Sequence, residues 1–304
     1  ALYENTSFDM PSLSGAEAAR AIAGQPYRLG QTPTVSQIEL SPLYHQSSQR
    51  FLAQIIRNAA FLAGVDEIHV SETLQADYLT LMRVGMRRLR SCRQLFQPWL
   101  RKSEKKHATL LLKHYRKFGR WRDKDMLWLE LQPKIIAAGL PAAKKLAPPK
   151  RVKRKSIRLA ADSAFQLLLL DNLICLVLEK GLKKQAIKPE NNARLARRLE
   201  QSWTGIQTLC TQFESLEPVD HHYLRNQIKR LRYNLEALGY DESTKLYVYL
   251  AKAQDHLGDL CDAYVAKDWY SEQAATPEQK QFALDWLQKK IHKFQAKCKK
   301  TLHS

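Results

Sequence analysis

The sequence contains few cysteines and no paired arrangement of them. The five cysteines are odd in number and lie far apart, and no two of them form a CxxC pair. A disulfide framework or a zinc cluster is therefore not expected. The cysteine usage fits a reducing compartment, so we expect a cytoplasmic protein.

The sequence also lacks an apolar run long enough to cross a bilayer. The longest such run, Phe165 to Leu178, spans too few residues and contains Asp171. Glycine and proline are scarce, at 11 and 12 of 304 residues, which excludes a collagen-like or low-complexity chain. These absences leave a globular chain without a membrane span.

Strand-like alternation of apolar and polar residues is almost absent. Apolar residues recur instead at intervals of three and four, which predicts an all-α protein. Pro148 and Pro149 stand in a stretch with eight basic residues between Lys144 and Arg158, so residues 142–155 are the predicted linker. The predicted helices span residues 14–23, 41–63, 72–97, 103–119, 121–138, 156–180, 191–216, 219–238, 243–270 with a break near 258, and 277–302.

Positive charge is in large excess and is unevenly distributed. Lysine and arginine number 49 against 30 aspartates and glutamates, which gives a formal charge of +19. Residues 77–158 hold 24 of the basic and 5 of the acidic residues, while the 25 basic and 25 acidic residues elsewhere cancel. A polyanion is the natural partner of such a region. Nucleic acid, an anionic membrane surface and a phosphate polymer are the candidates.

A short basic motif occurs twice in the chain. Residues 80–90 align with residues 222–232 through an arginine followed, four residues later, by a run of four residues that contains three basic groups. A glycine and an aspartate four residues apart follow each copy, and the two spacings of about 142 and 139 residues nearly agree. The repeat therefore predicts a duplicated domain in which each half supplies about four helices.

The expected domain organisation follows from the repeat and the linker. Residues 1–34 are an N-terminal extension or connector, residues 35–145 form the first helical bundle, and residues 146–304 form the basic linker and the second bundle.

Each copy of the motif places a row of polar and cationic residues, which we call the ladder, on one helix face. At 100° per residue, the members of each row fall within roughly 80° of arc. Rungs one turn apart are separated by about 5.4 Å along the axis, and arginine can bond two phosphate oxygens at once, which suits an extended phosphate chain. The rows are Thr80, Arg83, Arg87 and Arg90 in the first copy, and His222, Arg225, Lys229 and Arg232 in the second.

The alternative to a binding function is that the charged helix face is simply exposed to solvent, which is common. Asp123 and Asp262 would then pair with arginines of their own half. The ladder is nevertheless unbalanced, because no carboxylate lies between Asp77 and Glu104. It also recurs in the second half, which is otherwise nearly neutral. These two observations favour a binding function over a solvated surface.

At these positions the sequence resembles the CHAD (conserved histidine α-helical domain) family. Its motifs are H-x-x-R-V-x-x-R-R-L-R in the first half and H-x-L-R-x-x-x-K-R-L-R-Y in the second. Residues 83–90 match the first motif, residues 222–233 match the second in full, and the resemblance covers about residues 45–302. It implies two four-helix bundles related by a pseudo-twofold axis, with a basic surface between them. It also implies non-catalytic binding of inorganic polyphosphate, often with localisation to polyphosphate granules.

The resemblance implies a set of binding residues and no catalytic residue, metal or cofactor. The expected polyphosphate-binding residues are Arg83, Arg87, Arg88, Arg90, His222, Arg225, Lys229, Arg230 and Arg232. A secondary set of basic residues comprises Lys113, Arg116, Lys117, Arg120, Arg122, Arg151 and Arg154.

Two further features of the sequence relate to the CHAD resemblance: one departs from the family motif, and the other resembles a connector found in some members. Thr80 stands where the first-half motif has its histidine, which puts in doubt any role that needs both histidines. Residues 16–30, with Tyr27-Arg28-Leu29, resemble the connector that precedes CHAD in fusions with a CYTH domain, a triphosphate-processing barrel. The E-x-E-x-K signature of that barrel is absent from this sequence. The chain is therefore interpreted as a fragment of a longer fusion.

Three other functions remain as alternatives. The run Lys150–Lys155 and Trp121 are compatible with nucleic-acid binding, although aromatics do not interleave with the basic residues. Asp123 and Asp125 are the candidates for a metal-dependent phosphohydrolase, or the chain is an accessory domain of a triphosphate- or polyphosphate-processing enzyme. A protein-interaction scaffold is the third alternative. No glycine-rich phosphate loop or G-x-S-x-G motif supports catalysis.

Overall fold

The described part of the chain is helical apart from turns and one isolated bridge. The computed structural model describes residues 40–64, 72–126, 131–143, 153–184 and 190–303. No strand occurs within these ranges, and the bridge joins Leu100 to Leu182. None of the helices in these ranges is both long and apolar enough to cross a bilayer. The predicted all-α class is confirmed.

Ten α-helices and two short 3₁₀ helices occur in these ranges. The α-helices are α2 (Leu40–Ala63), α4 (Glu72–Leu95), α5 (Lys102–Met126), α6 (Gln132–Ala137), α7 (Lys153–Ala160), α8 (Ser163–Val177), α9 (Glu190–Thr211), α10 (Pro218–Ala237), α11 (Lys245–Gln273) and α12 (Pro277–Leu302), and the 3₁₀ helices are η2 (Gln97–Trp99) and η6 (Phe213–Ser215).

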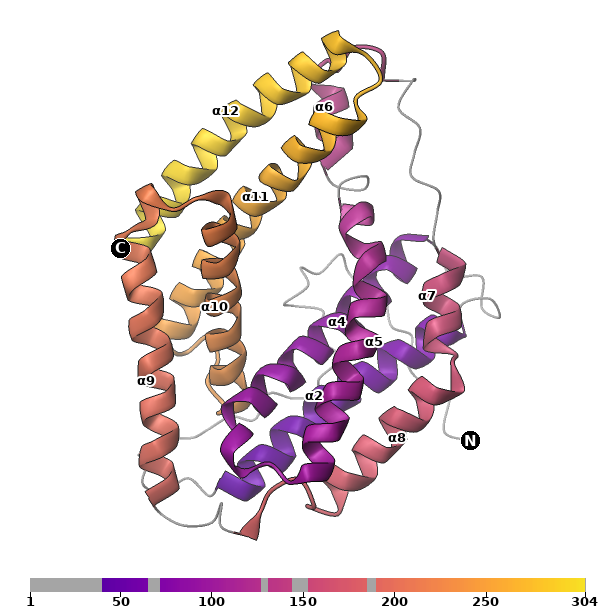
Figure 1. Cartoon of the computed structure of the whole chain (residues 1–304), viewed down its shortest axis with the longest axis vertical. Coiled ribbons are helices and arrows are strands. Elements are labelled where there is room, and N and C mark those ends of the chain that lie inside the picture. The colour runs from indigo at the N-terminus through magenta and orange to yellow at the C-terminus, as the bar shows by residue number, and fades with distance from the viewer. Residues whose placement is uncertain (1–39, 65–71, 127–130, 144–152, 185–189, 304) are drawn as a thin grey trace.

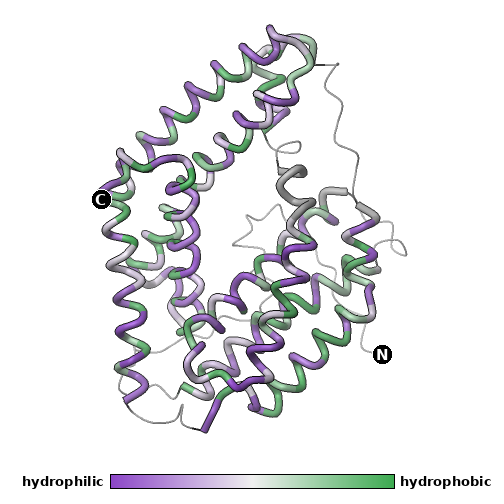
Figure 2. The backbone as a smooth tube through the Cα atoms, viewed as in Figure 1, coloured by the Kyte–Doolittle hydropathy of each residue, from purple (hydrophilic) through white to green (hydrophobic). Residues whose placement is uncertain are grey.

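The first group of helices consists of α2, α4, α5, α7 and α8 (Figure 1). α2 packs along α4 and also contacts α7 and α8, while α5 lies against α4 and α8. Their shared core is rich in aromatic residues, with Tyr44, Phe51, Phe96, Phe118 and Phe165 all buried. α8, which contains most of the long apolar run, stands out as hydrophobic in Figure 2.

The second group consists of α9, α10, α11 and α12. α11 and α12 form a long hairpin, and α10 packs between α11 and α9. Leu224 and Ile228 of α10 meet Leu250 and Leu257 of α11 in the core of this group. The hydroxyl of Thr276 caps α12 by accepting a hydrogen bond from the backbone N–H of Gln279.

The short helix α6 packs on the far end of the α11–α12 hairpin (Figure 1). Ile135 lies in a small separate core with Tyr270 and Leu287. The side-chain amide of Gln279 donates to the backbone carbonyl of Pro141 at 2.9 Å. The chain therefore visits the second group before it returns to the first with α7 and α8.

Several helix boundaries differ from the predicted ones. α5 continues through Gly119 to Met126, and α11 runs without a break through Gly258, because each glycine faces an arginine of the neighbouring helix. The predicted helix over residues 156–180 is two helices, since Asp162 adopts an extended conformation and caps the start of α8. The predicted helix at residues 14–23 and the extension over 1–34 lie outside the described residues.

The division between the two groups also differs from the predicted domain boundary. Residues 146–304 were expected to form the linker and the second bundle. Ile157, Ala160, Phe165 and Leu168, from α7 and α8, instead lie in the core of the first group. The apolar faces of these two helices are covered by α2 and α5, so the break in packing comes near the start of α9.

One buried carboxylate joins the two groups. Glu236 of α10 is buried, and its Oε2 lies 2.5 Å from Nε of Arg88 on α4. Tyr247 donates its hydroxyl hydrogen to Oε1 at 2.8 Å, and Arg232 Nη1 lies 4.0 Å from the same oxygen. Arg88 also donates to the side-chain oxygen of Gln54 on α2. Burial alone would raise the pKa of Glu236, but Arg88 and Arg232 lower it, so this carboxylate stays ionised.

The same junction holds the end of α10. The last carbonyls of a helix have no partner within the helix. Here α2 supplies partners: Ser47 Oγ donates to the carbonyl of Ala237 at 2.5 Å, and Arg50 Nη2 donates to that of Glu236 at 2.7 Å. Gly239 then reverses the chain with a φ of 87°, a left-handed conformation that glycine adopts without strain.

The substitution Glu236→Gln tests this junction. It keeps the shape of the side chain but leaves Arg88 as a buried cation without its counter-charge. We expect the free energy of unfolding to fall by about 3–5 kcal/mol, measured by urea denaturation. Glu214→Gln, which removes an exposed ion pair with Lys299, is the control and should leave the midpoint unchanged. A similar fall in the free energy of unfolding in both variants would show that the buried ion pair stabilises the protein no more than the exposed one.

Candidate anion-binding site

The two motif helices lie side by side where the groups meet. α4 and α10 pack against each other, with α5 beside α4 and α11 beside α10. Figure 1 shows the α4–α5 pair and the α10–α11 pair on opposite sides of the middle of the molecule. The fold therefore brings together two motif copies that are far apart in the sequence.

In the first copy, Arg83 is buried against α5. Its guanidinium carbon lies 4.7 Å from the ring centroid of Tyr115, a cation–π contact. A Cβ placed on Gly119 would lie 2.9 Å from Arg83 Nη1, so the absence of a side chain there leaves room for the guanidinium. Because only 5% of Arg83 is exposed, packing fixes its position.

In the second copy, Arg225 makes the equivalent contact with α11. A Cβ on Gly258 would lie 3.2 Å from Arg225 Nη2. Nη1 of Arg225 lies 3.6 Å from Oδ1 of Asp262, one turn further along α11. The aligned pairs Arg83 with Gly119 and Arg225 with Gly258 thus form the same contact in both halves. The side chain of Asp123, the counterpart of Asp262, lies outside the described residues.

Arg87 lies next to the second copy. Burial alone would raise the pKa of Tyr233 on α10, but Arg87, Arg232 and Arg88 together lower it, which places Arg87 near that ring. Nε of Arg87 and Nε of Arg225 are both buried and have no hydrogen-bond partner among the described residues. Buried donors are rarely left unsatisfied. An oxyanion bound beside either arginine would supply the missing acceptor.

Arg90 is exposed and borders a groove between α4 and α5. The groove has a volume of about 330 Å³, and Lys105, Thr109 and Tyr115 also line it. Arg90 therefore places a cation on the side of α4 that faces α5.

His222 and Lys229 are half-buried on α10, on either side of Arg225 along the helix. Burial lowers the pKa of His222, and Arg225 lowers it further; Asp262 opposes this effect, and Lys229 adds to it. The lowered pKa favours the neutral imidazole. A bound anion would oppose the effect of the neighbouring cations and so favour the protonated form.

Three of the nine expected binding residues, including one member of the ladder, do not lie with the other six. Arg88 and Arg232 are buried, 7% and 5% exposed, and face Glu236, so they belong to the junction between the groups. Arg230 is half-buried and borders a different groove, between α9 and α10. These three residues are therefore removed from the candidate site.

The secondary set is only partly described. Lys113, Arg116 and Lys117 are exposed on α5. Within the described ranges they take part in no ion pair, and neither do Arg87 and Arg90. The side chains of the other four members lie outside the described residues: Arg120, Arg122, Arg151 and Arg154.

One buried cluster has ligand types that metals use. Side-chain atoms of Glu104, His107 and Cys175 lie within 4.8 Å of one another. Arg93 Nη2 lies 2.5 Å from Glu104 Oε1, and Tyr44 donates to the same oxygen at 2.6 Å. Burial alone would raise the pKa of Glu104, but the contact with His107 at 3.5 Å, the charge of Arg93 and hydrogen bonds from Tyr44 and Arg93 hold it at about 2. Burial also raises the pKa of the Cys175 thiol to about 11. The arginine already neutralises the carboxylate, so we assign no metal to this cluster.

Comparison with known proteins identifies the family. The profile of the CHAD domain matches residues 59–271. The chain belongs to the CHAD family. The CHAD domain from the plant Ricinus communis, known from a crystal structure, is 23% identical and superposes with a TM-score of 0.62 over 92% of this chain and 97% of that one. At this identity the likeness shows a shared CHAD fold. A comparison with curated proteins finds no match.

The sequence alone did not identify two parts of this CHAD site. Tyr115 was not predicted to contact Arg83, although it stands four residues before Gly119 and so lies on the same face of α5. Gly119 and Gly258 were recognised as repeated positions but not as contacts of Arg83 and Arg225. In both copies the glycine follows the aligned arginine at nearly the same spacing, and this repetition in the sequence indicates a contact between them.

The surroundings of His222 predict the response of its pKa to substitution. Arg225→Ala removes the largest electrostatic contribution that lowers the pKa of His222, so we expect that pKa to rise. An NMR titration of the histidine signals measures it. Arg230→Ala removes a charge about two turns further along α10 that does not contribute to the shift of His222, and should leave the value unchanged. If neither variant moved the signal, the two side chains would not be neighbours in solution.

Proposed function

We propose that this CHAD domain binds inorganic polyphosphate without cleaving it, through the ladder cations of α4 and α10. The binding residues are Arg83, Arg87, Arg90, His222, Arg225 and Lys229, with the exposed basic residues of α5 as a secondary surface. Within the described ranges the first group has five helices and the second has four, and each group contributes one motif helix to the site. We expect the two halves to be related by a pseudo-twofold axis. The same binding would concentrate the protein at polyphosphate granules in the cytoplasm.

The observation that carries the proposal is the pair of unsatisfied buried donors. Arg87 and Arg225 come from different halves, and each keeps a buried Nε without a hydrogen-bond partner in the described ranges. Phosphate oxygens are strong acceptors, and charge-assisted bonds to guanidinium are shorter and stronger than neutral ones. A chain of linked phosphates supplies many such acceptors at short intervals, and therefore suits a row of cations better than a single phosphate does.

The seating of Arg83 and Arg225 also supports this function. Arg83 is held between Gly119 and the ring of Tyr115, and Arg225 is held against Gly258 and beside Asp262. A guanidinium held in place in this way loses little conformational entropy on binding. The phosphates of polyphosphate are all alike, so a row of pre-organised cations meets the same group at every position along the polymer. We therefore expect the affinity to depend on the length of the polymer and not on any sequence.

Substitution of ladder cations tests the proposal directly. Arg225→Ala with Lys229→Ala, and separately Arg87→Ala with Arg90→Ala, should weaken polyphosphate binding by at least tenfold in calorimetry. By analogy with nucleic acids, the plot of log affinity against log salt should become shallower by about one for each phosphate that the variant no longer neutralises. Helicity should not change. Unaltered affinity in both double variants would overturn the proposal.

Nucleic acid is the alternative ligand, and a competition experiment between DNA and polyphosphate tests it. Both polymers would bind with a strong salt dependence. If duplex or single-stranded DNA displaced polyphosphate at equal phosphate concentration, the basic surface would be a general polyanion site. Displacement only at a large excess of DNA is the expected result.

The helix glycines offer a second test with a matched control. Gly258→Ala places a methyl group 3.2 Å from Arg225 Nη2 and displaces the guanidinium, so polyphosphate affinity should fall several-fold. Alanine improves helix propensity by up to about 1 kcal/mol, so this loss should come without a loss of thermal stability. Gly205→Ala on α9, where a Cβ would meet nothing within 4 Å, is the control and should leave the affinity unchanged. Equal affinity in both variants would contradict the proposed role of the seated arginine.

A further inference from the structure

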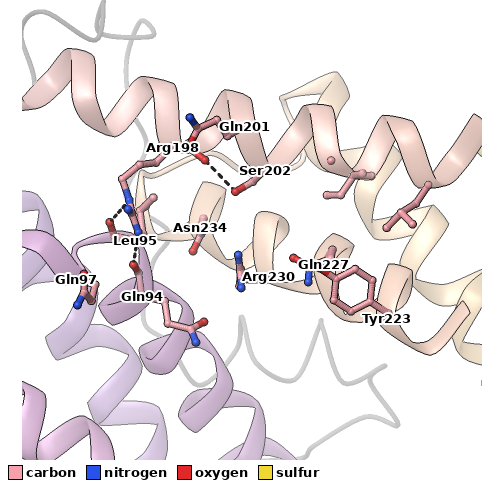
Figure 3. Close-up of a pocket in the computed structure, with 13 residues that line it drawn as sticks. Gln94, Leu95, Gln97, Arg198, Gln201, Ser202, Tyr223, Gln227, Arg230 and Asn234 are labelled. Atoms are coloured by element: carbon pink, nitrogen blue, oxygen red, sulfur yellow. Dashed lines mark hydrogen bonds between the residues drawn. The ribbon is translucent and has the colours of Figure 1, made fainter. Parts of the chain in front are cut away.

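A second site lies between the two groups, on the opposite side of α10 from the ladder. It is a groove of about 540 Å³ between α9, α10 and the C-terminal end of α4. Tyr223, Gln227, Arg230 and Asn234 recur along α10 at intervals of four, three and four and all line it (Figure 3). At 100° per residue this stripe is centred roughly 150° around α10 from the ladder. The groove is therefore a separate site.

One end of the groove is cationic. Arg198 of α9 donates to the backbone carbonyls of Leu95 and Gln94 at 3.1 and 2.9 Å, which fixes its guanidinium at the end of α4 (Figure 3). Burial lowers the pKa of Arg198, and the nearby Arg194 and Arg230 lower it further. No carboxylate is among the described residues that line the groove. Clustered arginines without a counter-charge favour a bound anion.

The other end is aromatic and apolar. Tyr223 is 54% exposed, so its ring is free to stack on a planar ligand. Ile206 and Leu209 of α9 also line the groove. Tyr223 and Arg230 are seven residues apart, or roughly 10 Å along the helix axis. A ligand that reaches both must be elongated, with an anionic end and a flat apolar end.

Between these ends the lining is rich in carboxamides. Gln94, Gln201, Gln227 and Asn234 come from three different helices. Asn234 is only 3% exposed, and its Oδ1 is buried without a hydrogen-bond partner in the described ranges. Carboxamides offer both donors and acceptors, which suits the mixed edge of a nucleobase or the hydroxyls of a sugar better than a bare phosphate.

A missing side chain keeps the groove open. Gly205 stands in the interior of α9 and lines the groove, and a Cβ there would meet nothing within 4 Å. Glycine within a helix is less stable than alanine. No steric clash with the described residues requires it here. A ligand lying against the bare backbone of α9 would account for the glycine.

We propose that this groove binds a nucleoside phosphate. The phosphates lie at Arg198 and Arg230, the base stacks on Tyr223, and the carboxamides bond the sugar and the edge of the base. The site is distinct from the polyphosphate ladder and does not depend on the function proposed for it.

The test is calorimetric titration of ATP, adenosine and inorganic tripolyphosphate. The titrations use the full chain with Arg87→Ala, Arg90→Ala, Arg225→Ala and Lys229→Ala, which weakens binding to both rows of the ladder. ATP should bind at one site per chain, at least tenfold more tightly than either tripolyphosphate or adenosine. Tripolyphosphate binding as tightly as ATP, or no saturable ATP binding, would overturn the proposal.

Two added substitutions locate the site. Gly205→Trp fills the groove from a position where a side chain has room, and Arg230→Ala removes the central cation; each should weaken ATP binding at least tenfold. Arg197→Ala, which removes an exposed cation of α9 that does not line the groove, is the charge-matched control and should change the affinity by less than twofold. Thermal unfolding verifies that each variant is folded. ATP binding that survives Gly205→Trp in a folded protein would place the nucleotide elsewhere.

Discussion

Glu236 is buried between α4, α10 and α11, where it meets two arginines and a tyrosine hydroxyl. A charge in such a place costs several kcal/mol of desolvation unless geometry and hydrogen bonding offset that cost. The partners come from both groups of helices, so the offset is complete only when the groups are docked. This requirement fixes α4 against α10, and with them the relative position of the two ladders.

The same constraint makes the duplicated motif unequal in its two copies. Arg88 and Arg230 occupy equivalent positions in the repeat, yet Arg88 pairs with Glu236 while Arg230 borders an open groove. Arg90 and Arg232 are also equivalent, yet Arg90 is exposed and Arg232 is buried beside the same carboxylate. One acidic residue in one half therefore decides which motif arginines remain available to a ligand.

The helical class, the repeat and the central rungs of the ladder could be predicted from the sequence, because all of them depend on periodicity within a single helix. Gly119 and Gly258 were taken as an end and a break, since a glycine in a helix usually weakens it. Their role depends on an arginine of another helix, which periodicity does not report. The burial of Arg88 could not be predicted for the same reason, because its partner Glu236 is 148 residues away in the sequence.

The path of the chain through the two groups sets how the protein can be divided. α6 leaves the first group to pack on the α11–α12 hairpin, and α7 and α8 then complete the first group. A cut at the predicted boundary after residue 145 would strip α7 and α8 from one fragment and leave them without their core in the other. Such a cut would separate α7 and α8 from the core that they complete, even though each half carries its own copy of the motif.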